Sequence, residues 1–185
     1  MYFFDLNDMP GGAHTDFCIP FENTLWLATK DLKDKNARNL CGAAAAANLA
    51  AYFINCGYSA LKAGSIEQTY REVHSIVGNG PKMTIARGAV KYFAKCGHDL
   101  HFKTDRSISK KSRINFVKNA VSLGRPCGIL LADKLFSWHW VLAVGYREYT
   151  DGVYLRIVDG WSNNASRFYK PGYGSVWIST TEYWI

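Results

Sequence analysis

The sequence lacks several features that would assign it to a protein class at once. No apolar run approaches the roughly 20 residues that a membrane-spanning helix requires. The first eight residues have neither the basic start nor the long apolar stretch of a signal peptide. We therefore expect a soluble chain without a membrane span, cytoplasmic as the chain stands, or secreted if an export signal has been removed from it.

The chain also contains no internal repeat and no segment with the composition of a linker. Its 185 residues suffice for one domain with a buried core, and 6 Trp, 11 Tyr and 10 Phe exclude a disordered or low-complexity chain. We expect a single domain over 1–185. An irregular N-terminal arm (1–38) is expected to precede a helical half (39–124) and a β half (125–185).

Acidic residues are fewer than basic ones, 15 against 22, which gives a net charge of +7. This charge permits attraction to nucleic acid, anionic lipid or acidic peptides, and composition alone does not choose among them. The densest basic stretch, 106–113, leads into apolar residues at helical spacing. A solvated helix start is the favoured interpretation, and a nucleic-acid or membrane patch is the alternative. We expect no nucleic-acid partner.

The cysteines lack the spacing of metal ligands. No CxxC or CxH pair occurs among them, so a zinc site is not indicated, and no metal or cofactor is expected. Their odd number leaves at least one thiol free in a monomer, and their wide spacing is more typical of reduced cysteines than of a disulfide framework. The five are Cys18, Cys41, Cys56, Cys96 and Cys127.

Secondary-structure signals differ between the two halves of the chain. An alanine-rich segment and three segments with apolar residues at helical spacing predict helices over 41–55, 65–77, 84–96 and 109–123. The arm before them is expected to hold one short strand at 25–28. Runs rich in β-branched and aromatic residues predict strands over 126–132, 138–148, 153–158 and 175–178, with a hairpin over 146–154. Helices followed by an antiparallel sheet indicate an α+β fold.

Cys41 is the cysteine best placed to act as a nucleophile. It stands at the predicted start of the alanine-rich helix, where unpaired N–H groups and the helix dipole stabilise a thiolate. Gly42 beside it leaves room for the backbone of a substrate. Cys56 and Cys96 lie at the C-termini of predicted helices, where the dipole disfavours a thiolate.

A nucleophilic cysteine needs a base, and His139 lies in a β-run where an ionisable ring is out of place unless it faces a site. Asp159 ends the next strand, so adjacent strands could place it beside His139 to fix the ring, with Trp161 shielding their contact from water. Each residue alone has a structural explanation, and their order and context favour a triad. The other four histidines have no comparable setting.

Three segments, 39–53, 139–146 and 154–161, resemble the Cys, His and Asp/Asn blocks of papain-like cysteine peptidases. The likeness is greatest to the bacterial branch that includes the leader-cleaving peptidase domains of bacteriocin-exporting transporters. The three blocks have the order and the approximate spacing of that group. The resemblance implies a papain-like fold, with the nucleophile at the start of a central helix, and a peptide or protein substrate.

The resemblance also implies a role for each residue. Cys41 would attack a carbonyl, His139 would move the proton, and Asp159 would orient His139. Trp161 matches the tryptophan that follows the orienting residue. The glutamine that usually serves as oxyanion donor is replaced by Lys35, so the side-chain amide of Asn36 or Asn39 is the candidate to act with the Cys41 N–H.

Three functions share these residues. The favoured one is a thiol peptidase that acts through an acyl-enzyme. The second is an amidase or acyltransferase with the same triad and a different acyl acceptor. The third is a binding or toxin-like module that keeps the papain fold without turnover.

Overall fold

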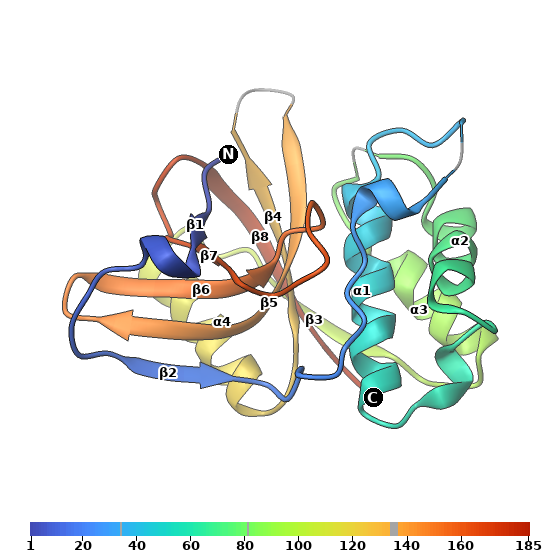
Figure 1. Cartoon of the computed structure of the whole chain (residues 1–185), viewed down its shortest axis with the longest axis horizontal. Coiled ribbons are helices and arrows are strands. Elements are labelled where there is room, and N and C mark those ends of the chain that lie inside the picture. Colours follow the sequence, from blue (N-terminus) through green and yellow to red (C-terminus); the bar gives the residue numbers. More distant parts are fainter. Residues whose placement is uncertain (34, 81, 134–136) are drawn as a thin grey trace.

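The computed structural model describes residues 1–33, 35–80, 82–133 and 137–185. Within them the chain combines helices with one antiparallel sheet, as expected for an α+β fold (Figure 1). Helices α1, α2 and α3 lie together on one side of the molecule, and α4 packs against the sheet away from them. The four helices are α1 (Cys41–Asn55), α2 (Ile66–Val77), α3 (Ala86–Lys95) and α4 (Lys110–Ser122).

The helix predictions are confirmed, and two of the starts have the expected caps. The Ser65 side chain accepts a hydrogen bond from the Gln68 N–H at the start of α2. Ser109 does the same for the Ser112 N–H at the start of α4. Serine is favoured at these positions because its oxygen satisfies an N–H that has no partner within the helix.

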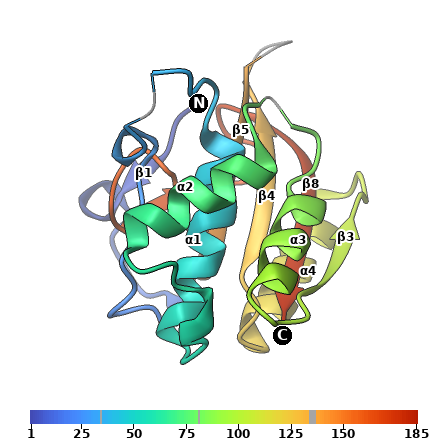
Figure 2. The ribbon, with the colours of Figure 1, turned by 90° about the vertical axis from the view of Figure 1, so that its right-hand side faces the viewer.

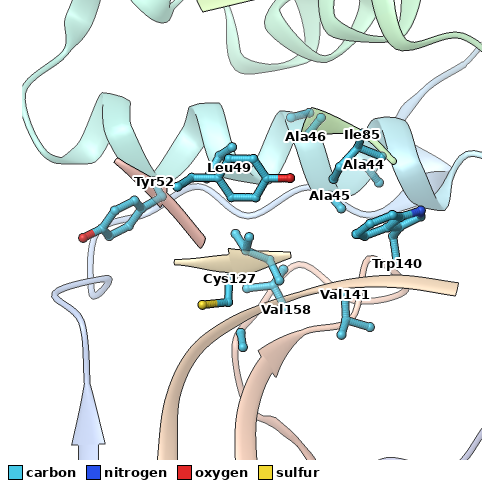
Figure 3. Packing of buried hydrophobic residues seen from close by; sticks show 14 of the residues in the cluster. Ala44, Ala45, Ala46, Leu49, Tyr52, Ile85, Cys127, Trp140, Val141 and Val158 are labelled. Carbon is cyan, nitrogen blue, oxygen red and sulfur yellow. The ribbon is translucent and has the colours of Figure 1, made fainter. Parts of the chain in front are cut away.

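Helix α1 is buried on every side, because small side chains let neighbours approach it closely. Its residues from Gly42 to Phe53 are all buried. In Figure 3, Ala45 and Leu49 face the sheet residues Trp140 and Val158. Helices α2 and α3 cover the side of α1 that the sheet does not (Figure 2). The first residue of this central helix is Cys41, so the candidate nucleophile is fixed to a helix that is buried along most of its length.

The sheet has eight strands in the order β1-β7-β6-β5-β4-β8-β3, with β2 paired to β5. Strand β4 covers one edge of β5 along its first half, and β2 continues along that edge. On the other edge, β6 pairs with β5 only as far as Leu142, which leaves the edge at His139 to other residues. The strands are β1 (Phe4–Asp5), β2 (Thr15–Cys18), β3 (His101–Asp105), β4 (Cys127–Ala132), β5 (Trp138–Tyr149), β6 (Gly152–Val158), β7 (Arg167–Tyr169) and β8 (Val176–Trp184).

Two expectations about the division of the chain are wrong. The arm at 1–38 contributes β1 and β2 to the sheet, and the expected helical half contributes β3, which pairs with β8. No strand forms at 25–28, because the Asn48 side chain of α1 binds both the N–H and the carbonyl of Leu27.

None of the helices in the described part of the chain is both long and apolar enough to cross a membrane.

Candidate active site

Cys41 occupies the first residue of α1, and its side chain is partly buried against β5. The thiol Sγ lies 3.9 Å from the Trp138 carbonyl oxygen. Burial raises the pKa of the Cys41 thiol, and hydrogen bonds from the backbone N–H groups of Trp140, Gly42 and Cys41 itself offset this only in part. The helix start therefore brings the thiol to the backbone on both sides of His139, but leaves it protonated at neutral pH.

His139 is almost completely buried, and one of its two ring nitrogens has a fixed partner. Its Nε2 lies 2.7 Å from the backbone carbonyl oxygen of Asp159. A carbonyl oxygen can only accept a hydrogen bond, so Nε2 carries the proton and donates it. The lone pair is then on Nδ1, and this nitrogen is the one available as a base.

Aromatic rings hold the imidazole plane. The Trp161 ring stacks on His139 with 4.3 Å between centroids and 24° between planes, and Phe3 of the N-terminal arm lies 6.1 Å away. Burial lowers the pKa of His139 to about 4, against the opposing effect of the Asp159 carbonyl and charge. The imidazole is therefore neutral at pH 7 and able to accept a proton.

Asp159 meets His139 through its backbone and uses its carboxylate for another purpose. Oδ1 accepts hydrogen bonds from the Trp161 N–H, the Ser162 N–H and the Ser162 hydroxyl, at 2.9, 3.0 and 2.9 Å. Oδ2 lies 3.9 Å from Arg167 Nε. The carboxylate thus closes the turn that follows β6 and fixes where the Asp159 carbonyl points. The sequence suggested that Asp159 lies beside His139, and the contact in the structure is made by the Asp159 backbone carbonyl.

Because of these hydrogen bonds, two substitutions at Asp159 should have different effects on stability and on the His139 ring. Asp159→Asn keeps the backbone carbonyl and an amide oxygen that can accept from Trp161 and Ser162, so we expect it to cost less than about 1 kcal/mol of stability. Asp159→Ala removes all three hydrogen bonds and should cost roughly 1–3 kcal/mol. The imidazole nitrogen shifts in an NMR spectrum should show the Nε2–H tautomer retained in the asparagine variant and lost from the alanine variant. Equal disturbance of the ring by both substitutions would show that the carboxylate charge holds it instead.

Cys41 and His139 line the same cavity, whose volume is about 560 Å³. Trp138, Trp161 and Asn39 contribute to its wall. Asn39 adopts a left-handed backbone conformation, φ 50°, which asparagine tolerates better than most residues. Its carbonyl accepts a hydrogen bond from the Gly80 N–H at 3.2 Å, which anchors the loop that leads into α1.

The two candidates for the oxyanion donor are in different places. Asn39 reaches the cavity of Cys41. Asn36 is not among the described residues that line this cavity, and its carbonyl accepts a hydrogen bond from the Asn79 side chain at 3.1 Å. Lys35, at the position where the resemblance to papain-like peptidases would place a glutamine, lines a second cavity beside α2.

Two charged residues of the cavity were not anticipated from the sequence. Lys30 and Arg38 line the cavity of Cys41, on segments that the sequence described only as an irregular arm. Their positive charges were visible in the composition, but no periodic pattern placed them. In the described part of the chain, no cluster of His, Cys, Asp or Glu side chains could hold a metal ion.

A scan of protein-family models found none that matches this chain, and a search of curated proteins also found no match.

Proposed function

We propose that this protein is a papain-like cysteine peptidase that hydrolyses peptide bonds through a thioester. Cys41 is the nucleophile, His139 the base, and Asp159 the residue that orients the base. The observation that carries the proposal is the shared cavity, into which a helix N-terminus presents Cys41 and a strand presents a neutral histidine with its Nε2 already occupied.

The reaction follows from these protonation states. As Cys41 Sγ attacks the carbonyl carbon of a bound peptide, its proton passes to His139 Nδ1. The imidazolium then gives that proton to the leaving amine nitrogen as the C–N bond breaks, and a thioester remains on Cys41. Water attacks the thioester and gives a proton to His139. The carboxylic acid is released as Sγ takes the proton back.

The negative charge that develops on the substrate oxygen needs hydrogen-bond donors. The Cys41 N–H belongs to the first turn of α1, where N–H groups have no partner within the helix. The side chain of Asn39, which lines the same cavity, is the second donor in this proposal.

A second candidate function is a papain-fold module that binds its ligand without turnover. Two observations favour it: the resting thiol and imidazole are both neutral, and a lysine occupies the position of the usual glutamine donor. An amidase or acyltransferase would use the same three residues and differ only in the group that accepts the acyl chain.

The peptidase proposal is tested by trapping the acyl-enzyme. We expect acid quenching during turnover of a mixed peptide-ester library to leave a thioester on Cys41, identified by mass spectrometry after digestion. Cys41→Ala should show no adduct, and His139→Ala should form it far more slowly. The absence of any adduct and any product from folded wild-type protein would favour the binding module.

The same experiment separates hydrolysis from acyl transfer. Hydroxylamine or glycinamide is added during turnover, and the products are compared with those formed in water alone. A peptidase should release mainly the free acid. A transferase should give mainly the amine adduct even when the added amine is dilute.

A further inference from the structure

Two cations, Lys30 and Arg38, line the cavity of Cys41. Lys30 lies on the short 3-10 helix Thr29–Asp31, and Arg38 lies on the segment leading into α1. No aspartate or glutamate is among the described residues that line this cavity, and His139 is neutral. The space next to the thiol therefore carries two positive charges.

The side chains of Lys30 and Arg38 have no charged or hydrogen-bonded partner among the described residues. Among the residues that the structure describes, neither the Lys30 nor the Arg38 side chain takes part in an ion pair or a side-chain hydrogen bond, and both side chains are exposed. The acid next in sequence, Asp31, is occupied elsewhere, because its Oδ2 accepts hydrogen bonds from the Ala28 N–H and the Asn163 amide. Both cations remain available to a ligand.

A second set of cations lies on the other side of the same loop. Lys33, Lys35 and Arg71 line a cavity of about 710 Å³ together with His74. Asn79 fixes the loop between the two cavities.

The Asn79 amide binds the loop in two places. Its Oδ1 accepts from the Arg38 N–H at 3.0 Å, and its Nδ2 donates to the Asn36 carbonyl at 3.1 Å. Cations thus line both the cavity of the thiol and the cavity beside α2, and Asn79 holds the backbone between them at Asn36 and Arg38.

The other basic stretch of the sequence does not contribute to this surface. It leads into α4, which lies on the sheet away from α1 (Figure 1). Arg113 is buried there, and its guanidinium donates to the carbonyls of Ser107, Trp177 and Ile178. That stretch therefore includes a structural arginine, and its exposed lysines lie on α4, away from the cleft.

We propose that the Cys41 cleft selects polypeptide substrates that carry Asp or Glu side chains next to the cleaved bond. Lys30 and Arg38 pair with the acidic side chains beside the thiol, and Lys33, Lys35 and Arg71 contact acidic residues farther along the peptide. This inference rests on the proposed peptidase function. A peptide is favoured over a nucleic acid because these cations flank a thiol and a base whose chemistry requires an acyl carbon.

A binding measurement tests the selectivity without requiring turnover. The probes are two fluorescein-labelled peptides that differ only by Glu or Gln at several positions, and the protein is the full chain with Cys41→Ala. Fluorescence anisotropy should show the Glu peptide binding about tenfold more tightly, which corresponds to a few partly exposed ion pairs. The difference should disappear at about 1 M salt, where the screening length falls to about 3 Å.

Charge reversal at the cleft provides the decisive comparison. Lys30→Glu with Arg38→Glu should remove the preference for the Glu peptide, whereas Lys111→Glu, an exposed lysine on α4, should leave it unchanged. Equal binding of the two peptides, or an equal loss in the Lys111 control, would overturn the inference. Tighter binding of a single-stranded oligonucleotide of the same charge would also overturn it, in favour of a nucleic-acid ligand.

Turnover then separates the two proposals. If wild-type protein cleaves Glu and Gln peptides at the same rate and binds them equally, the peptidase proposal stands and the acidic preference fails. If it cleaves neither peptide but binds the Glu form through Lys30 and Arg38, the peptidase proposal fails and the acidic-ligand site stands.

Discussion

Lowering the pH from 7 to 4 is expected to remove roughly 3 kcal/mol of unfolding free energy through His139 alone. Burial lowers the pKa of this residue to about 4 in the folded protein, whereas an exposed histidine has a pKa near 6.5. Between these two values the unfolded chain binds a proton that the folded chain does not. Stability is therefore complete above pH 6.5 and falls as the pH drops towards 4.

Urea unfolding at several pH values measures this effect, and His139→Gln is the matched control. Glutamine keeps an N–H donor for the Asp159 carbonyl but has no charge to gain, so its stability should depend less steeply on pH over this range. Other groups titrate in both proteins and cancel in the comparison. An identical pH dependence in the two proteins would show that the imidazole is hydrated in solution and not held as it is here.

The burial of His139 also sets the pH range in which this residue can act as a base. A histidine that stays neutral down to about pH 4 keeps a ring nitrogen free to accept a proton throughout the neutral range, although the lowered pKa also makes it a weaker base. The raised pKa of Cys41 means that the proton leaves the thiol only as the reaction begins. The proposed mechanism is therefore general-base attack by a thiol, in which His139 is needed although no ion pair exists beforehand.

The helices were predictable because each carries its own signal. Helix α1 is rich in alanine. Helices α2 and α4 begin at serine caps, and a glycine lies just beyond α2. These signals depend on residues within one or two turns of each other. The β5–β6 hairpin was predictable for the same reason, since Asp151-Gly152 lies between two β-rich runs. Thr150 and Asp151 form the turn, and Gly152 begins β6 opposite Tyr149.

The strands that the sequence did not reveal depend on distant partners. β1 and β7 are two and three residues long, and they pair with each other across most of the chain. β3 has exposed residues at its start and becomes a strand by pairing with β8. Strand formation at such places is decided by the tertiary partner and not by the local pattern.

The candidate site also combines features that local sequence predicts with features that depend on distant parts of the chain. The placement of Cys41 at a helix start and of His139 in an apolar strand could be predicted because both are local features. The role of the Asp159 carbonyl could not, because it depends on a turn in which the side chain binds Trp161 and Ser162 instead. Lys30 and Arg38 reach the cavity only because the segment before α1 is folded back over it.

Asn48 holds part of that segment, and Asn48→Ala is expected to destabilise the protein by roughly 2–5 kcal/mol. The Asn48 side chain is 1% exposed and binds the N–H and carbonyl of Leu27 at 2.7 and 2.9 Å. Leu27 is itself 3% exposed. Alanine leaves both backbone groups buried without a partner, and each such group costs about 1–3 kcal/mol.

Asn55→Ala provides the control, because Asn55 is an exposed residue of the same helix. We expect this change to alter the unfolding free energy by no more than about 0.5 kcal/mol. Chemical denaturation gives both values, and hydrogen exchange at the Leu27 amide should quicken only in the Asn48 variant. If the two alanine variants were equally stable, the Leu27 backbone would be solvated in solution. The segment that carries Lys30 into the cavity would then lack its anchor on α1.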